Sequence, residues 1–256
     1  MGAGPADCLG RVEGLTSGKQ PGNELMAQQS ASGSPPATGD KFFSAPHFRQ
    51  PDAAQALQWL RRYPFGVLIT TGASGVRATS LPFVVEKDDP ADIRLLGHIA
   101  LRNSHAADLP SVNEVLIVAN GPSAYISPRW YAGPANVPTW NYVGLQLRGR
   151  IELLPAETDR RYVLKRTVDE FERRAATPWR LSDAPEDLVA RLLGGIVAFR
   201  IGPCRLECVE KLGQNKPGAD TEGTMAGLRE EGDEMSHAVA RMMQQIFASQ
   251  AKARCD

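Results

Sequence analysis

Between residues 65 and 154 the chain is a succession of short apolar, β-branched runs separated by turn-forming residues. Such runs predict strands, and short turns between consecutive strands predict antiparallel neighbours. The predicted strands span residues 65–72, 76–86, 92–100, 114–121, 123–127 and 140–154. Helices do not alternate with these strands, which excludes a doubly wound α/β fold. The pattern therefore predicts a mostly antiparallel sheet that curls into a barrel.

Helical patterns lie on both sides of the predicted barrel. Residues 50–64 have apolar positions at helical spacing, and we expect Pro51 in the first turn of that helix. A helix in residues 183–194 is expected to open with a capping box made by Asp183 and Glu186. Further elements are expected as a helix over 156–175, a strand over 195–212, and two helices in 224–250 that are separated at Gly232.

The first 41 residues differ in composition from the rest of the chain. They are rich in Gly, Ser, Ala, Gln and Pro, and such a segment buries too little apolar surface to offset the entropy of ordering it. We therefore expect a disordered tail over residues 1–41 and a single folded domain over residues 42–250. The chain has 29 basic and 29 acidic residues, a balance that is atypical of a direct DNA-binding protein.

Residues 127–142, SPRWYAGPANVPTWNY, concentrate aromatic side chains and prolines. Proline fixes its own φ and lacks an amide donor, so we interpret the segment as a stiffened loop that carries aromatic rings. Four rings at irregular spacing are typical of a core or of an oligomer interface. They also suit a stacking platform for a planar ligand, and composition alone leaves these alternatives open.

Two short segments are candidates for binding an anion. In RATS, residues 77–80, Arg77 and Thr79 share one face of a predicted strand, and an Arg beside a hydroxyl suits a phosphate monoester. The alternative is a solvated face of an edge strand. In GHIALRNS, residues 97–104, Arg102 lies beside a predicted helix start, where Asn103 or Ser104 could equally serve only as a cap.

Several other classes of site lack a signature. The chain has no Gly-rich phosphate loop and no nucleophile elbow, and His98, His105 and Asp108 match no usual metal-ligand spacing. Cys204 and Cys208 are expected to be reduced. No apolar run approaches the roughly 20 residues that span a bilayer, so we expect no membrane segment and a cytoplasmic location.

The segment AYISPRWYAGPANVPTWNYVGLQLRGR resembles the signature of the PaiB-type family of FMN-binding negative transcriptional regulators. The resemblance extends over residues 42–248 and includes FGVLITT, ATSLPF, LLGHIALRNSH, GIVAFRI and KLGQNKPG in the expected order. The chain departs from the family pattern at Ser80, Ser104 and Ala106, where relatives often have His, Pro and Trp. The family implies a mainly β fold with peripheral helices, an antiparallel, Greek-key-like FMN-binding split barrel.

The resemblance also implies a cofactor, a homodimer and a set of site residues. Proteins of this architecture typically hold flavin at or near the subunit interface. The residues implied for the phosphate and ribityl side of FMN are Arg77, Thr79, Ser80, His98, Arg102 and Asn103. Trp140, Asn141 and Tyr142 would shape the ring site or the dimer contact, and the residues implied to close the site are Gln214, Asn215 and Lys216.

Two functions follow from the resemblance. The first is a dimeric, flavin-binding repressor of transcription, which acts on DNA directly or, as the zero net charge favours, through a DNA-binding partner. The second is a flavin-dependent oxidoreductase that uses a reduced nicotinamide or another small donor, in which FMN would supply the redox chemistry. A barrel that binds no flavin and serves as a dimeric scaffold is a further alternative.

Overall fold

The computed structural model describes residues 42–72, 75–133 and 136–252, with side chains up to Ser249. The chain divides into two units, residues 1–40 and residues 41–256, and the second unit is described below. The predicted disordered tail lies outside the described residues.

Within the described residues, seven strands form one sheet in the order β2-β1-β5-β6-β7-β4-β3, and every neighbouring pair is antiparallel. Their bounds are β1 Phe65–Gly72, β2 Gly75–Pro82, β3 Val84–Asp89, β4 Asp92–Ala100, β5 Glu114–Ile126, β6 Thr139–Leu153 and β7 Ile196–Lys211.

The two edge strands of this sheet are consecutive in the chain. β2 ends at Pro82 and β3 begins at Val84, so Phe83 joins the two edges and the sheet must curl for them to meet. A Cβ built on Gly97 of β4 would lie 3.2 Å from Leu81 Cδ1 of β2, which shows how closely these strands approach. Because no ladder joins β2 to β3, the barrel stays open along this seam. The predicted antiparallel split barrel with peripheral helices is confirmed.

Two strand predictions were wrong in their bounds. Residues 76–86 were expected as one strand, but β2 and β3 are separate, since Pro82 lacks the amide needed to continue a ladder. Residues 114–121 and 123–127 were expected as two strands, but β5 is continuous. A register shift against β6 between Asn120 and Ser123 accommodates Gly121 and Pro122.

The interior of the barrel is filled by side chains from alternate positions of the strands. Leu68, Ile117 and Leu145 are fully buried there, together with Phe199 of β7. Helix α2, Ala53–Arg62, adds Leu57 and Leu60 to the same cluster. Asp52 caps α2 by accepting from Gln55 N at 2.8 Å, so Pro51 precedes the cap and is not in the first turn as expected.

Other helices lie outside the barrel. Val163 of α4 packs with Val84, Leu96, Leu154 and Ala198 on the outer face of the sheet. The expected capping box of α5 was wrong: the cap residue of that helix is Pro185, and the Asp183 carboxylate accepts from Arg180 N in a separate turn. The bounds of these elements are α3 Ser104–Asp108, η1 Leu109–Ser111, α4 Glu157–Glu172, η3 Leu181–Asp183 and α5 Glu186–Leu193.

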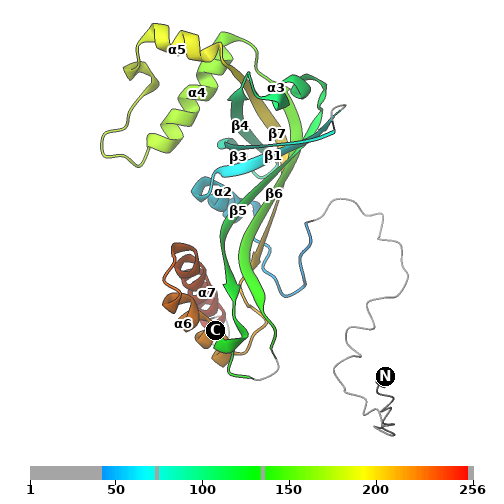
Figure 1. Cartoon of the computed structure of the whole chain (residues 1–256), viewed down its shortest axis with the longest axis vertical. Coiled ribbons are helices and arrows are strands. Elements are labelled where there is room, and N and C mark those ends of the chain that lie inside the picture. Colours follow the sequence, from blue (N-terminus) through cyan, green and yellow to red (C-terminus); the bar gives the residue numbers. More distant parts are fainter. Residues whose placement is uncertain (1–41, 73–74, 134–135, 253–256) are drawn as a thin grey trace, which may run out of the picture. The chain divides into compact units, whose positions relative to one another are not determined.

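The C-terminal part forms two helices, α6 Gly218–Glu230 and α7 Glu234–Lys252. The expected break lies at Gly232, whose φ of +76° is a left-handed conformation that favours glycine. Helix α7 packs on β5 and on α6. Figure 1 shows β5 and β6 continuing beyond the barrel as a long ribbon that ends beside these two helices.

Candidate functional site

One group of predicted site residues meets where β2 and α3 come together at the end of the barrel. Arg77 and Thr79 of β2 pair with Thr70 and Leu68 of β1. Directly opposite residues of an antiparallel pair share a face, so both β2 side chains lie on the inner face of the sheet. Asn103 caps α3 and donates through Nδ2 to Thr79 Oγ1 at 3.2 Å. We call this group the barrel-end cluster: Arg77, Thr79, Asn103, His105 and Asp108.

His105 lies at the centre of the barrel-end cluster. It is 1% exposed, and its ring nitrogens lie 2.8 Å from Thr70 Oγ1 and 2.9 Å from Thr79 Oγ1. Burial lowers the pKa of His105 below its usual value of 6.5, against the opposing charge of Asp108. A neutral imidazole has one donor and one acceptor nitrogen, which suits two hydroxyl partners. The ring therefore joins β1 to β2 and fixes the position of the Thr79 hydroxyl.

The cationic part of this region consists of two arginines. Arg77 donates through Nε to Asp108 Oδ2 at 3.0 Å, and its side chain remains 37% exposed. The Arg77 guanidinium is thus paired with Asp108 while part of its side chain faces solvent. Arg102 is exposed in the turn between β4 and α3. Two guanidinium groups, a threonine hydroxyl and the Asn103 amide form a donor set that suits a phosphate group.

Ser80 and His98 lie near the seam but on the outer face of the sheet. Ser80 follows Thr79 on β2 and therefore points to the outer face. His98 pairs with Ala198, which belongs to the apolar cluster under α4, so its side chain is also on the outer face. Burial lowers the pKa of His98. These two residues are the chain neighbours of Leu81 and Gly97, where β2 and β4 approach each other.

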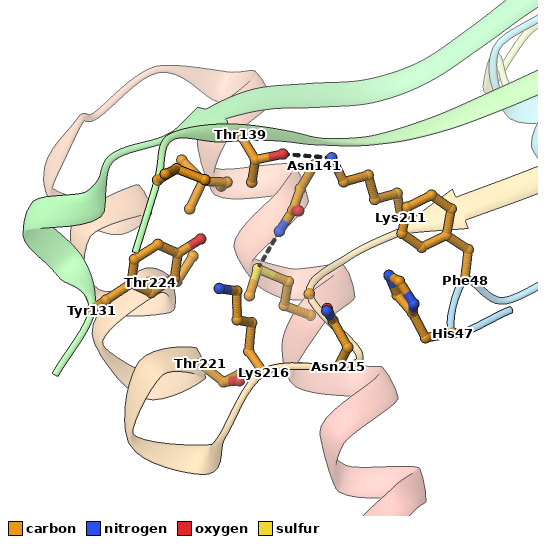
Figure 2. Close-up of a pocket in the computed structure, with 14 residues that line it drawn as sticks. His47, Phe48, Tyr131, Thr139, Asn141, Lys211, Asn215, Lys216, Thr221 and Thr224 are labelled. Carbon is orange, nitrogen blue, oxygen red and sulfur yellow. Dashed lines mark hydrogen bonds between the residues drawn. The ribbon is translucent and has the colours of Figure 1, made fainter. Parts of the chain in front are cut away.

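A second group of predicted residues lines a cavity of about 270 Å³ at the far end of the β5–β6 ribbon. We call it the C-terminal pocket. Figure 2 shows that its walls come from the ribbon, from the segment before α2, from the end of β7 and from α6. Asn141, Asn215 and Lys216 from the predicted set line it, with His47, Phe48, Tyr131 and Lys211.

Two lysines face the C-terminal pocket: Lys211 at the end of β7 and Lys216 in the turn before α6. Lys211 donates through Nζ to Thr139 Oγ1, and burial lowers the pKa of this ammonium group. Lys216 donates to Asn136 Oδ1 at 2.7 Å, and its Nζ lies 4.4 Å from the centre of the Tyr131 ring. Figure 2 shows Lys216 extending toward Tyr131 while Lys211 lies close to Thr139. Both ammonium groups thus have neutral oxygen partners.

Three further predicted residues lie near this pocket without lining it. Trp140 and Tyr142 flank the buried Asn141 on strand β6, which agrees with the predicted strand over residues 140–154, so they point to the face opposite to Asn141. Trp140 is 55% exposed and contacts Tyr125 edge-on at 6.3 Å between ring centres. Gln214 is engaged in its own turn, because its side chain bonds Leu212 N and Glu210 O.

Within one chain the two groups are far apart. Across the sheet Thr79 pairs with Leu68, which pairs with Ile117 of β5, whereas the C-terminal pocket begins at Ile126 of that strand. Nine residues of extended strand correspond to roughly 30 Å. One flavin mononucleotide is shorter than this, so it cannot contact both groups of a single chain.

Sequence reasoning did not identify several residues of these two groups. Thr70 contacts His105 of the barrel-end cluster, and His47 and Lys211 line the C-terminal pocket. Thr70 shares the inner face with Leu68 by strand alternation, which is a signal for its location. The sequence holds no comparable signal for His47, because the segment that carries it has no regular structure before α2.

Residues 42–203 match the family described as "Putative FMN-binding domain". The "Protease synthase and sporulation protein PAI 2" of Bacillus subtilis is 27% identical over 80% of this chain and 97% of its own length. An uncharacterized protein of Aspergillus fumigatus is 30% identical over 73% of this chain and 91% of its own length.

Among solved structures, the FAD and heme binding protein from Mycobacterium smegmatis aligns with a TM-score of 0.50 at 16% identity. The alignment covers 70% of this chain and 80% of that one, and this likeness concerns the fold. The family match covers well over half of the chain and contains all of the barrel-end cluster. The chain belongs to the PaiB-type family of FMN-binding proteins, and FMN is its cofactor.

Proposed function

We propose that the chain binds FMN with its barrel end and acts as a homodimeric, PaiB-type negative regulator of transcription. The observation that carries the flavin site is the contact of Asn103 Nδ2 with Thr79 Oγ1, which unites the donors of β2 with those of α3. Arg77, Thr79, Arg102 and Asn103 would hold the phosphate. Ser80 and His98 point to the opposite face of the sheet and are not part of the proposed phosphate site. When bound, FMN supplies a redox-active ring.

The donor set supports this assignment because its positive charge exceeds its negative charge. Asp108 offsets one of the two arginines, and His105 is neutral through burial. The exposed guanidinium of Arg102 therefore remains to attract a phosphate. The barrel end also lies within residues 42–203, where the family match falls.

A homodimer is supported by the outer face of β2, β1 and β5. Phe65 and Val76 on this face are 64% and 71% exposed, beside the half-buried Val67 and Ile69. Exposed apolar side chains that share one face mark an interaction surface, and the same face on a second copy would give an isologous contact. We assign Trp140, which is exposed on the β5–β6 ribbon, to the same dimer contact.

The regulatory role is supported by the relative that is named for protease synthesis and sporulation. Direct DNA binding has less support, since two of the basic residues of α4 are paired with carboxylates. Arg161 contacts Glu157 and Glu186, and Lys165 contacts Asp169. We therefore assign the contact with DNA to a partner protein. The free cysteines Cys204 and Cys208 fit a reducing, cytoplasmic location.

The test of the flavin site is a titration of the purified chain with FMN, followed by quenching of flavin fluorescence. Arg77→Met and Arg102→Met should each weaken binding at least about tenfold, because hydrogen bonds to charged groups contribute about 1.5–3 kcal/mol. Arg191→Met on α5 is the matched control and should leave affinity unchanged. Equal affinities of all four proteins would remove the barrel end as the phosphate site.

The dimer and the role of the flavin need separate measurements. Sedimentation should show a dimer that Ile69→Asp converts to a monomer, whereas Phe171→Asp on α4 leaves it intact.

Multiple-turnover bleaching of the bound flavin by reduced nicotinamide would favour the alternative function, a flavin-dependent oxidoreductase. Salt-sensitive retention of promoter DNA by the isolated dimer would replace the partner protein by direct contact.

A further inference from the structure

The C-terminal pocket contains two positive charges that no carboxylate of the described chain neutralises. Among the described residues, Lys211 and Lys216 take part in hydrogen bonds to neutral oxygens and in no ion pair. The residues that line the pocket include no Asp or Glu. Ammonium groups that are partly withdrawn from water without a counter-charge favour an anion in the space between them.

The acidic residues closest to these lysines in the chain have other partners. The carboxylate of Glu210 accepts from Trp59 Nε1 and from Arg49 on the far side of β7. Asp220 is buried and accepts from the backbone amides of Ala132 and Gly133 at 2.9 and 3.4 Å. The Glu210 carboxylate is thus paired outside the pocket. Burial, and after it the charge of Asp220, raises the pKa of Tyr131, so the Asp220 carboxylate lies close to the wall that Tyr131 forms while its own hydrogen bonds go to the two backbone amides.

The walls of the pocket combine apolar surface with polar side chains. Phe48, Tyr131 and Val137 offer flat or branched apolar surface, and Met243 of α7 closes one side. The side-chain amides of Asn141 and Asn215 add hydrogen-bonding groups. A cavity of about 270 Å³ lies just below the range of roughly 300–1,000 Å³ that holds drug-sized ligands. This volume suits an occupant that is smaller than a nucleotide.

We propose that the C-terminal pocket is a second ligand site, which binds a small organic anion with a flat apolar body, of the aromatic carboxylate class. The anionic group lies between Lys211 and Lys216, and the ring lies against Phe48 and Tyr131. This site is separate from the proposed flavin site. It is roughly 30 Å along β5 from the barrel-end cluster, and half of its lining comes from residues after 203.

Ligand occupancy of this pocket would be sensed by the C-terminal helices. Thr221 and Thr224 of α6 and Met243 of α7 line the pocket, and Asn141 of the ribbon donates to Met243 Sδ at 3.4 Å. A bound ring therefore touches the ribbon and both helices at once. The pocket is placed to stabilise the packing of α6 and α7 on β5.

The test uses the full chain loaded with FMN, and it measures binding of benzoate, salicylate and phenyl phosphate by titration calorimetry and ligand-detected NMR. At least one of these anions should bind saturably, and uncharged benzyl alcohol should bind at least tenfold more weakly. The double variant K211M/K216M should lose at least tenfold in affinity. The exposed lysine pair variant K87M/K165M is the matched control and should bind as the unmodified chain does.

Other outcomes separate the alternatives. If K211M/K216M does not fold, Asn215→Asp at the exposed rim should weaken anion binding by adding a negative charge, and K211R/K216R should retain it. Failure of all three anions to bind the unmodified chain overturns the proposal, as does equal binding of benzyl alcohol. Release of FMN by the anions, with loss of FMN affinity in K211M/K216M, would instead assign the pocket to the flavin.

Discussion

The carboxylate of Glu210 accepts a hydrogen bond from the indole of Trp59, with 2.7 Å between Nε1 and Oε1. Glu210 is only 2% exposed, and its second oxygen accepts from Arg49 at 2.8 Å. The backbones of Arg49 and Glu210 also bond each other in both directions. This arrangement attaches the segment before α2 to β7, and that segment carries His47 and Phe48 into the C-terminal pocket.

Trp59→Phe should lower the free energy of unfolding by about 1.5–3 kcal/mol, because it keeps an aromatic ring but leaves a buried carboxylate oxygen without its donor. Urea denaturation measures this change. Trp179→Phe is the control, since Trp179 is 44% exposed, and its effect should stay within about 0.5 kcal/mol. Equal effects of the two substitutions would show that the bond to Glu210 contributes nothing.

Gly227→Ala should destabilise the packing of α6 against Trp130. A Cβ at Gly227 would lie 2.4 Å from atoms of the Trp130 ring, and overpacking of this kind costs about 1–3 kcal/mol. Gly218→Ala in the same helix is the control, because a Cβ there meets nothing within 4 Å. Thermal unfolding followed by tryptophan fluorescence should show a lower midpoint for Gly227→Ala alone. A higher midpoint from improved helix propensity would contradict the prediction.

Stability should fall as the pH decreases below about 6.5. Burial lowers the pKa values of His98 and His105 in the folded chain below their ordinary value of 6.5. The unfolded chain therefore binds protons that the folded chain does not, so the stabilisation is complete above 6.5 and is lost as the pH falls through the folded pKa values. Urea denaturation at several pH values between about 7.5 and 5.5 measures the slope. His105→Gln should reduce this slope, and a slope unchanged in both His98→Gln and His105→Gln would refute the assignment.

Cys204 and Cys208 should resist thiol reagents in the folded chain. They are 8% and 4% exposed, and burial raises the pKa of each thiol to about 12. At pH 8 only about one such thiol in ten thousand is ionised, and the thiolate is the reactive form. A chain with Cys8→Ser and Cys255→Ser isolates these two thiols for reaction with Ellman's reagent. Two equivalents should react only after unfolding, and rapid labelling under native conditions would contradict this.

Strands and helix ends were predicted well where they depend only on residues that are close in the sequence. The run at residues 65–72 coincides with β1, and Gly232 separates the last two helices as expected. Errors arose where distant contacts overrode local signals. Gly121 and Pro122 suggested a turn, but pairing with β6 on both sides keeps β5 continuous through a register shift. Asp183 looked like a helix cap, yet its carboxylate bonds the amide of Arg180.

The site was predicted less completely than the fold. Arg77, Thr79 and Asn103 were placed together by the resemblance, and they do lie together in the barrel-end cluster. His105, which connects Thr79 to Thr70, had no pattern that distinguished it from any other histidine in a short helix. Trp140 was grouped with Asn141 by the resemblance, but neighbours on a strand point to opposite faces.

The order of apolar runs, turns and glycines was by itself enough to determine an antiparallel barrel with helices after it, because strand alternation and turn chemistry act over a few residues. Only the tertiary structure decided which functional side chains meet. Lys216 contacts Asn136, and Arg77 contacts Asp108, across segments that are far apart in the chain. Such contacts depend on the register of the strands and on the packing of the helices. The residues on either side of each polar side chain in the sequence do not indicate which distant partner it will meet.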